Sequence, residues 1–270
     1  MTRSHQAESS RFYARDGSGV VYELDSADGR KKIRPDVRHA RKHGFLWSFS
    51  AISRSLAKPS LEQWRIDRAV ETAIGTERLP GETDDSYITR IGSLTKEAQE
   101  LTIDRGTEIH AQLKDFFTEG ADPPDPACKT AVIQISSWLS GLGIELVESE
   151  KVFTNIELGY GGTIDLYGCS TGKPLSILAD FKSTNLHKYR KPYFENGLQL
   201  VAYLDGVKAP PGTRLFTIPI DQESGECRFI EWDFKADWSI DELREAWKAL
   251  YTAFAIQHKY DPRAWKGDPT

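Results

Sequence analysis

Cysteine is scarce in this chain of 270 residues, and the three that occur, Cys128, Cys169 and Cys227, lie far apart. No two of them form a CxxC pair, which a zinc ribbon or a four-cysteine iron–sulfur site would use. We therefore expect neither kind of site. A sparse and odd number of cysteines is typical of proteins from a reducing compartment.

Long apolar runs are also missing. No stretch approaches the ~20 apolar residues that a membrane-spanning helix needs, and the N-terminal sequence MTRSHQAESSRFYARDG has no apolar segment of the kind found in secretory signals. With 39% hydrophobic and 28% charged residues, the composition is typical of a soluble globular protein. We expect a cytoplasmic protein without membrane contact, built as one large domain or two small ones.

The chain lacks an overall positive charge. Its net charge of −5 does not by itself indicate a nucleic-acid-binding protein. The bases are nevertheless unevenly distributed, because residues 30–43 hold seven Lys or Arg against one Asp, and residues 182–191 hold four and no acid. Such clusters are more often solvated surface than binding sites, so their meaning depends on their neighbours.

Turn and cap signals divide the chain into an N-terminal extension, residues 1–90, and a core, residues 91–270. The extension is expected to hold a hairpin around Asp16-Gly17 and two helices, the second of which starts at a capping box of Ser60 and Gln63. The apolar periodicity of the core predicts helices at 85–119, 127–141, 193–207 and 239–260, and strands at 144–155, 160–168, 175–184, 213–220 and 226–234. This order predicts an α/β fold with a mixed central sheet flanked by helices.

Three charged residues stand in the apolar strands of this core. Asp165 lies within YGGTIDLYG, and Asp180 and Lys182 lie within LSILADFKST. Burying a charge costs several kcal/mol unless it is paired or bound to a cation. Asp180 and Lys182 are two residues apart and so face the same way. Two aspartates that converge from neighbouring strands would suit a hard divalent cation such as Mg²⁺, whereas the simpler alternative is a structural ion pair.

Five segments in this order resemble the PD-(D/E)XK nuclease superfamily, and within it the RecB-like and Cas4-like branch that includes phage exonucleases and the mitochondrial genome maintenance exonuclease. The segments are RGTEIH (105–110), Glu150, GTID (162–165), DFK (180–182) and QLVAY (199–203). The stretch SFSAISRSLAKPSLEQWRIDRA also resembles the leader of phage members. The cysteines that bind an iron–sulfur cluster in many Cas4-like relatives are absent from this sequence.

The resemblance implies a restriction-endonuclease-like core with a Mg²⁺ or Mn²⁺ site and no iron–sulfur cluster. It implies metal ligation by His110, Asp165, Asp180 and the backbone carbonyl of Phe181, and a catalytic role for Lys182. Gly106 would let the helix of His110 approach closely. Glu150 would be an auxiliary acid, with Glu148 as the alternative, and Gln199 would reach the edge of the site, with Tyr203 one helical turn further on.

The basic segment STNLHKYRK directly follows the DFK strand. We expect Lys188, Arg190 and Lys191 to bind phosphates, Tyr189 to stack on a nucleobase, and Tyr203 to contact DNA or simply to pack. The resemblance implies a metal-dependent DNA exonuclease of replication, recombination or repair, of phage type and therefore acting in a bacterial host, with DNA ends as substrate and a single-strand annealing or binding protein as partner. The alternatives are a catalytically inactive nucleic-acid-binding partner and a structure-specific endonuclease.

Overall fold

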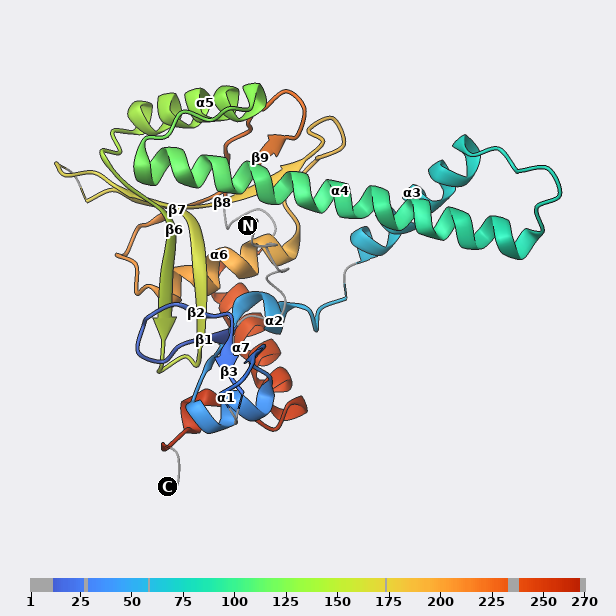
Figure 1. Ribbon diagram of the computed structural model, residues 1–270. Coiled ribbons are helices and arrows are strands. Elements are labelled where there is room, and N and C mark those ends of the chain that lie inside the picture. The colour runs from blue at the N-terminus through green and yellow to red at the C-terminus, as the bar shows by residue number, and fades with distance from the viewer. Residues whose placement is uncertain (1–11, 27–28, 58, 173, 233–237, 268–270) are drawn as a thin grey trace.

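The structure is a computed structural model that describes residues 12–26, 29–57, 59–172, 174–232 and 238–267. A mixed β-sheet lies between two layers of helices (Figure 1). Helices α4 (Asp84–Glu119) and α5 (Pro126–Leu142) cover one face, while α6 (Phe194–Gly206) and α7 (Ile240–Gln257) lie on the other side. The expected α/β fold with a mixed central sheet flanked by helices is therefore confirmed.

The sheet is built around three long strands, β6 (Leu146–Asn155), β7 (Tyr160–Cys169) and β8 (Ser176–Thr184). β6 and β8 both pair antiparallel with β7, and β9 (Arg214–Asp221) pairs parallel with β8 after the chain has crossed over through α6. The first six residues of β8 are all buried. Burial of successive residues is typical of a strand that is covered on both faces.

The N-terminal strands join the same sheet. β1 (Phe12–Tyr13) pairs with β2 (Val20–Val21) as the expected hairpin and also with β5 (Leu46–Ser48), which runs parallel to the start of β7. Between them lie the small hairpin of β3 (Leu24–Asp25) and β4 (Lys32–Ile33) and the helix α1 (Val37–His43). The expected division at residues 90 and 91 falls inside the continuous helix α4.

Helix α4 is long and extends beyond the sheet, where α3 (Pro59–Gly75) runs beside it (Figure 1). Thr83 caps its start and Gly120 adopts a left-handed conformation at its end. Helix α2 (Phe49–Ser53) is capped by Ser48, whose side chain accepts a hydrogen bond from the Ala51 N–H. The expected box of Ser60 and Gln63 involves a side chain that lies outside the described residues. No helix in the described part of the chain is long and apolar enough to cross a membrane.

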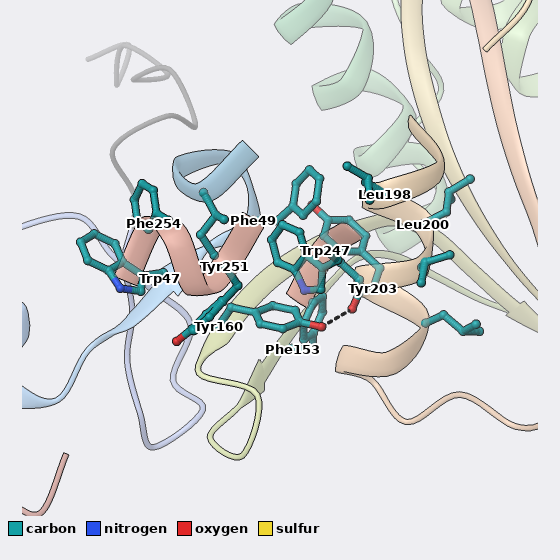
Figure 2. Close-up of a cluster of buried hydrophobic side chains, with 14 of the residues drawn as sticks. Trp47, Phe49, Phe153, Tyr160, Leu198, Leu200, Tyr203, Trp247, Tyr251 and Phe254 are labelled. Carbon is teal, nitrogen blue, oxygen red and sulfur yellow. Dashed lines mark hydrogen bonds between the residues drawn. The ribbon is translucent and has the colours of Figure 1, made fainter. Parts of the chain in front are cut away.

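An aromatic core joins α2, α6 and α7 to β5 and β7 (Figure 2). Trp247 stacks on Phe49, and the Tyr160 hydroxyl donates a hydrogen bond of 2.8 Å to the Ala202 carbonyl. At Gly162 an added Cβ would come within 2.7 Å of both Phe153 and Tyr203. The second glycine of the GGTID segment is therefore needed because aromatic rings pack directly on the β7 backbone.

The expected lengths of one strand and of the last helix were wrong. The strand expected at 226–234 is the short β10 (Ile230–Glu231), and residues 233 and 234 lie outside the described part. A bend at Cys227, which is held by one isolated bridge to Ile220, separates β10 from the turn. The last helix ends at Gln257 instead of near residue 260, because Tyr260 turns back to donate a hydrogen bond to the Phe45 carbonyl.

Candidate active site

The candidate site lies where one edge of β7 has no strand partner. β6 follows the whole length of one edge of β7, but the other edge is shared between β5 at residues 160–161 and β8 at residues 166–169. Residues 162–165 therefore face a gap between β5 and β8. The side chain of Asp165 fills the end of this gap, because its Oδ2 accepts a hydrogen bond of 2.6 Å from the Phe181 backbone N–H.

Three side chains that could hold a metal ion converge at this gap. His110 comes from α4, Glu150 from β6 and Asp165 from β7, and one ligand atom of each lies within 4.8 Å of the others. His110 Nδ1 is 3.6 Å from Asp165 Oδ1. The sheet register places Glu150 opposite Asp165, since Ser149 pairs with Leu166 and Lys151 with Ile164. Ligand atoms of both carboxylates lie within 4.8 Å of the His110 ring nitrogen of α4, so both side chains meet that helix.

Glu150 is the glutamate that the structure brings to this group, whereas Glu148 is not. Glu148 is exposed and forms an ion pair with Lys151, in which Glu148 Oε1 lies 2.6 Å from Lys151 Nζ. Glu150 has a φ of +51°, which a non-glycine residue rarely adopts. Such a backbone conformation costs about 1–3 kcal/mol and is found most often at functional sites.

Gly106 was expected to permit the close approach of α4, and this expectation was wrong. A Cβ at Gly106 would meet Ser183 at 3.5 Å, which is ordinary van der Waals contact. The position of α4 is instead fixed by buried apolar residues on the same face, with Ile109 and Leu113 packed against α5 and the sheet. The ring of His110 lies edge-on to Phe181, with centroids 5.9 Å apart.

The surrounding charges hold His110 as a cation. Burial alone would lower its pKa, but the charge of Asp165 and the hydrogen bond to it, together with the charge of Glu150, raise the pKa of His110 to about 9. The pKa of Asp165 is lowered, because His110 and Lys182 outweigh the burial that would raise it. In the metal-free state, a proton on His110 thus balances part of the negative charge of the two carboxylates.

Asp180 and Lys182 form a second, deeper pair beside this group. Asp180 is only 2% exposed, and its Oδ2 lies 2.7 Å from Lys182 Nζ. Burial raises the pKa of Asp180 to about 6, because Lys182 opposes this effect only in part and the charge of Asp165 adds to it. The Asp180 carboxylate is therefore held in an environment that disfavours its ionised form.

This environment predicts that Asp180→Asn stabilises the metal-free protein. The folded-state pKa lies above the unfolded value, so the stability that the protonated carboxyl contributes is lost as pH rises from about 4 through 6. A shift of two units corresponds to about 3 kcal/mol. Chemical denaturation at pH 7.5 should show the variant to be more stable than the wild type by about 1–3 kcal/mol, and this gain should shrink toward pH 4.

Asp221→Asn is the matched control, for which we expect the opposite change in the free energy of unfolding. Backbone N–H groups of Ser224, Leu186 and Glu223 hold the pKa of Asp221 below its usual value, although burial opposes them. Its ionised form is thus favoured on folding, and the amide should lower the free energy of unfolding at pH 7.5. An Asp180→Asn variant that is less stable than the wild type at pH 7.5 would contradict the prediction.

A hydrogen-bonded chain links Lys182 to helix α6. Lys182 Nζ donates to Gln199 Oε1 at 3.1 Å, and Gln199 Nε2 donates to the Tyr203 hydroxyl at 3.2 Å. Gln199 therefore lies at the edge of the site, one helical turn before Tyr203. Tyr203 is 5% exposed and packs against Phe49 and Phe153. Its expected contact with DNA is wrong for this structure, because its ring is buried.

The basic loop after β8 offers cations but not the expected aromatic ring. Lys188, Arg190 and Lys191 are exposed. Lys188 also lies 3.8 Å from Glu71 of α3. Tyr189 is 6% exposed, and its hydroxyl has no hydrogen-bond partner among the described residues. Stacking of Tyr189 on a base is therefore wrong for this structure, because the loop turns its ring inward against neighbouring side chains.

Sequence reasoning missed Tyr193, which lies close to this loop. Tyr193 is 48% exposed and its ring meets that of Tyr189 edge-on. It occupies the N-cap position of α6. Its place directly before the apolar run of α6 could have pointed to it, because a cap residue lies outside the packed face of the helix that follows.

Comparison with known proteins gives weak likenesses only. No protein-family model matches the chain, and no curated protein matches it. Among solved structures, a candidate exonuclease from Eubacterium rectale is 12% identical with a TM-score of 0.37, over 57% of this chain and 67% of that one. An alkaline exonuclease from Laribacter hongkongensis is 14% identical with a TM-score of 0.36, over 77% and 87%. Values this low establish neither a shared family nor a shared activity.

Proposed function

We propose that this chain is a metal-dependent DNA nuclease of the PD-(D/E)XK superfamily. The observation that carries the proposal is the convergence of His110, Glu150 and Asp165 at the unpaired edge of β7, next to the buried pair of Asp180 and Lys182. These residues are far apart in the sequence, and they include each acidic, imidazole and lysine position that the resemblance implies. A structural ion pair alone would not need the additional histidine and glutamate.

The donor set fits a divalent cation. One imidazole nitrogen and two carboxylates offer ligand atoms within 4.8 Å of one another, and this mixture suits Mn²⁺ as well as Mg²⁺. His110 and Asp165 would hold the ion, with Glu150 beside them, and Asp180 and the Phe181 carbonyl are further proposed ligands. A bound ion of this kind would polarise a phosphate oxygen and stabilise the charge that develops during hydrolysis.

Lys182 is the residue that we expect to act on the attacking water. Its ammonium group contacts Asp180 Oδ2 and Gln199 Oε1. Its side chain is 31% exposed, so one side remains open to solvent. From this position Lys182 can orient a water molecule, accept its proton after losing its own, and offset phosphate charge. Gln199 keeps the ammonium group at the edge of the site.

Exposed cations next to the site favour DNA as the substrate. Lys188, Arg190 and Lys191 follow the β8 strand that carries Asp180 and Lys182, so phosphates flanking the cleaved bond would meet them. Tyr193 replaces Tyr189 as the proposed stacking residue, because its ring is exposed. The RecB-like or Cas4-like branch, a phage-type role in recombination and a bacterial cytoplasmic setting are further parts of the proposal, and they rest on the five sequence segments.

The proposed activity is tested by digestion of labelled linear DNA, single- and double-stranded, with Mg²⁺, with Mn²⁺ and with EDTA. We expect loss of DNA from its ends with either metal and none with EDTA. Covalently closed circular DNA of the same sequence should remain intact, because an exonuclease requires an end. Cleavage of the circle would show an endonuclease instead. Binding of DNA without cleavage under every metal condition would contradict the proposal and favour an inactive binding protein.

A further inference from the structure

The strongest concentration of positive charge on the chain lies outside the candidate site. Residues 30–43 carry seven bases and one acid, a net charge of +6, so the remainder of a chain with net charge −5 carries −11. Within this stretch, no ion pair or hydrogen bond among the described residues engages the side chains of Lys31, Arg34, Arg38 and Lys42, and all four are exposed. These cations are directed to solvent without a structural task.

The fold adds bases from the other end of the chain. Arg41 of α1 donates a hydrogen bond of 2.6 Å to the His258 carbonyl, and Trp265 Nε1 donates one of 3.0 Å to the Arg41 carbonyl. The C-terminal segment is thereby fixed against α1, and its exposed Lys259 and Lys266 come near the α1 bases. We call the set of exposed bases the basic surface: Lys31, Arg34, Arg38, Lys42, Lys259 and Lys266.

Acids near the basic surface offset little of this charge. Asp25 is paired with Lys32 at 2.7 Å, and Lys32 is not part of the set. Asp36 caps α1 by accepting hydrogen bonds from the backbone N–H groups of Arg38 and His39. Glu23 is exposed close to the same hairpin. The six residues of the basic surface carry a charge of +6, of which Asp36 and Glu23 offset two at most, so most of it remains available to an anionic partner.

The strand register gives the separation between the basic surface and the candidate site. β5 runs parallel to β7 with Ser48 opposite Gly161, so Leu46 lies about six residues before Asp165 along the strand direction. At ~3.3 Å per residue this is about 20 Å, and α1 precedes β5. Figure 1 shows α1 at the end of β5 that lies away from α4. A DNA duplex covers 20 Å with about six base pairs.

We propose that the basic surface binds the phosphate backbone of the DNA that extends beyond the candidate site. The proposal rests on the proposed nuclease function. Exposed lysines and arginines bind phosphates without reading the sequence, and outside residues 30–43 the chain carries a net negative charge. The surface therefore sets how long a substrate must be for full affinity: DNA shorter than about six nucleotides reaches only the site, and longer DNA reaches both.

The test uses the full chain with Lys31, Arg34, Arg38 and Lys42 all changed to Gln. Binding of fluorescent DNA is measured by anisotropy in EDTA, so that cleavage plays no part, with a 30-base-pair duplex and a single-stranded trinucleotide at several salt concentrations. The matched control changes four exposed bases elsewhere to Gln, namely Lys96, Lys129, Lys208 and Lys248. Thermal unfolding of both variants checks that each is folded.

For the duplex, we expect the surface variant to bind about 10- to 100-fold more weakly at low salt and to lose about two to four units from the slope of log K against log salt. The trinucleotide should bind both variants and the wild type equally. Equal duplex affinity and equal slope for the surface variant and its control would overturn the inference. Equally strong, surface-dependent binding of polyglutamate would also overturn it, because the surface would then suit an acidic protein.

The outcome remains separate from that of the proposed function. If the wild type digests linear DNA while the surface variant binds the duplex normally, the inferred role of the basic surface is wrong and the proposed nuclease function is supported. If the wild type digests no DNA while the variant loses duplex binding, DNA binding by the basic surface is supported and the proposed nuclease function is contradicted. In the case that both stand, the digestion rate at limiting enzyme should fall for the long duplex only.

Discussion

Replacing Lys182 by Met should reduce the rate of DNA cleavage by about 1,000-fold or more, which corresponds to about 4 kcal/mol of transition-state stabilisation. Methionine fills a similar volume but provides no proton acceptor and no positive charge. The Asp180 carboxylate would also lose its ion-pair partner at 2.7 Å, so its pKa should rise above the present value of about 6. Single-turnover digestion of end-labelled DNA with Mg²⁺ measures the rate.

Lys182→Arg separates the two roles of the lysine. Arginine keeps the positive charge but does not give up its proton in proteins. If Lys182 only balances phosphate charge and orients water, the arginine variant should retain a substantial part of the rate. If Lys182 accepts the proton of the attacking water, the arginine variant should be as slow as the methionine variant.

Lys151→Met is the matched control for this experiment. Lys151 lies on β6 of the same sheet and pairs with Glu148 at 2.6 Å, so the variant also removes a paired strand lysine. We expect its rate to stay within about threefold of the wild type. Because Lys182→Met leaves a buried carboxylate unpaired, the double variant Asp180→Asn with Lys182→Met provides a folded form in which both charges are absent. A Lys182→Met variant that keeps a tenth of the wild-type rate would contradict the proposed role of Lys182 in cleavage.

Replacing Asp165 by Asn should weaken the binding of Mn²⁺ by at least about 100-fold, since one carboxylate ligand is lost. The amide oxygen can still accept the hydrogen bond from the Phe181 N–H that now goes to Asp165 Oδ2, so the end of the gap should keep its shape. Titration calorimetry with Mn²⁺ in the absence of DNA measures the affinity without relying on cleavage.

The pH dependence of this binding follows from His110. The charge of Asp165 and its hydrogen bond, against the effect of burial, raise the pKa of His110 to about 9, and only the neutral imidazole can bind a metal. Below pH 9 the ion must displace a proton, so the apparent affinity should rise by up to about tenfold per pH unit between pH 6.5 and 9 and then level off. A flat profile over this range would exclude His110 as a ligand.

Asp205→Asn serves as the control for Asp165→Asn. Asp205 lies in α6 and pairs with Arg244 of α7 at 2.7 Å, outside the group of candidate ligands. Its loss should leave Mn²⁺ affinity and its pH dependence unchanged. An equal loss of affinity in both variants would mean that the effect comes from general destabilisation and not from a missing ligand.

The elements around the site follow from local sequence signals. The apolar run of β8 predicts a covered strand, and the capping box of Ser239 and Glu242 marks the start of α7 as the structure has it. Asp180 and Lys182 lie two residues apart on one strand, so their shared face follows from strand geometry alone. Such signals involve neighbouring residues, and each can be recognised without knowledge of the rest of the chain.

Other features depend on contacts between distant segments. Tyr189 lies in a segment with four Lys or Arg residues, residues 182–191, and this sequence suggests an exposed ring. The folded loop instead buries the ring of Tyr189 and exposes that of Tyr193. The spacing to Asp165 favoured Glu150 over Glu148, which regular alternation would place on the same face, whereas the structure has a positive φ at Glu150 and brings Glu150 alone of the two to the candidate ligands. The gap beside Asp165 exists only because β5 and β8 divide one edge of β7 between them.

The sequence by itself thus determined the α/β class, most of the helices and strands, and the residue types of the candidate site. Helical and strand periodicity, caps and the cost of burying charge act over a few residues, and they are therefore readable from the chain. Only the tertiary structure decided that His110, Glu150 and Asp165 meet, and that the bases of α1 join those of the C-terminal segment. These arrangements depend on strand register and helix packing across more than a hundred residues, where no local rule applies.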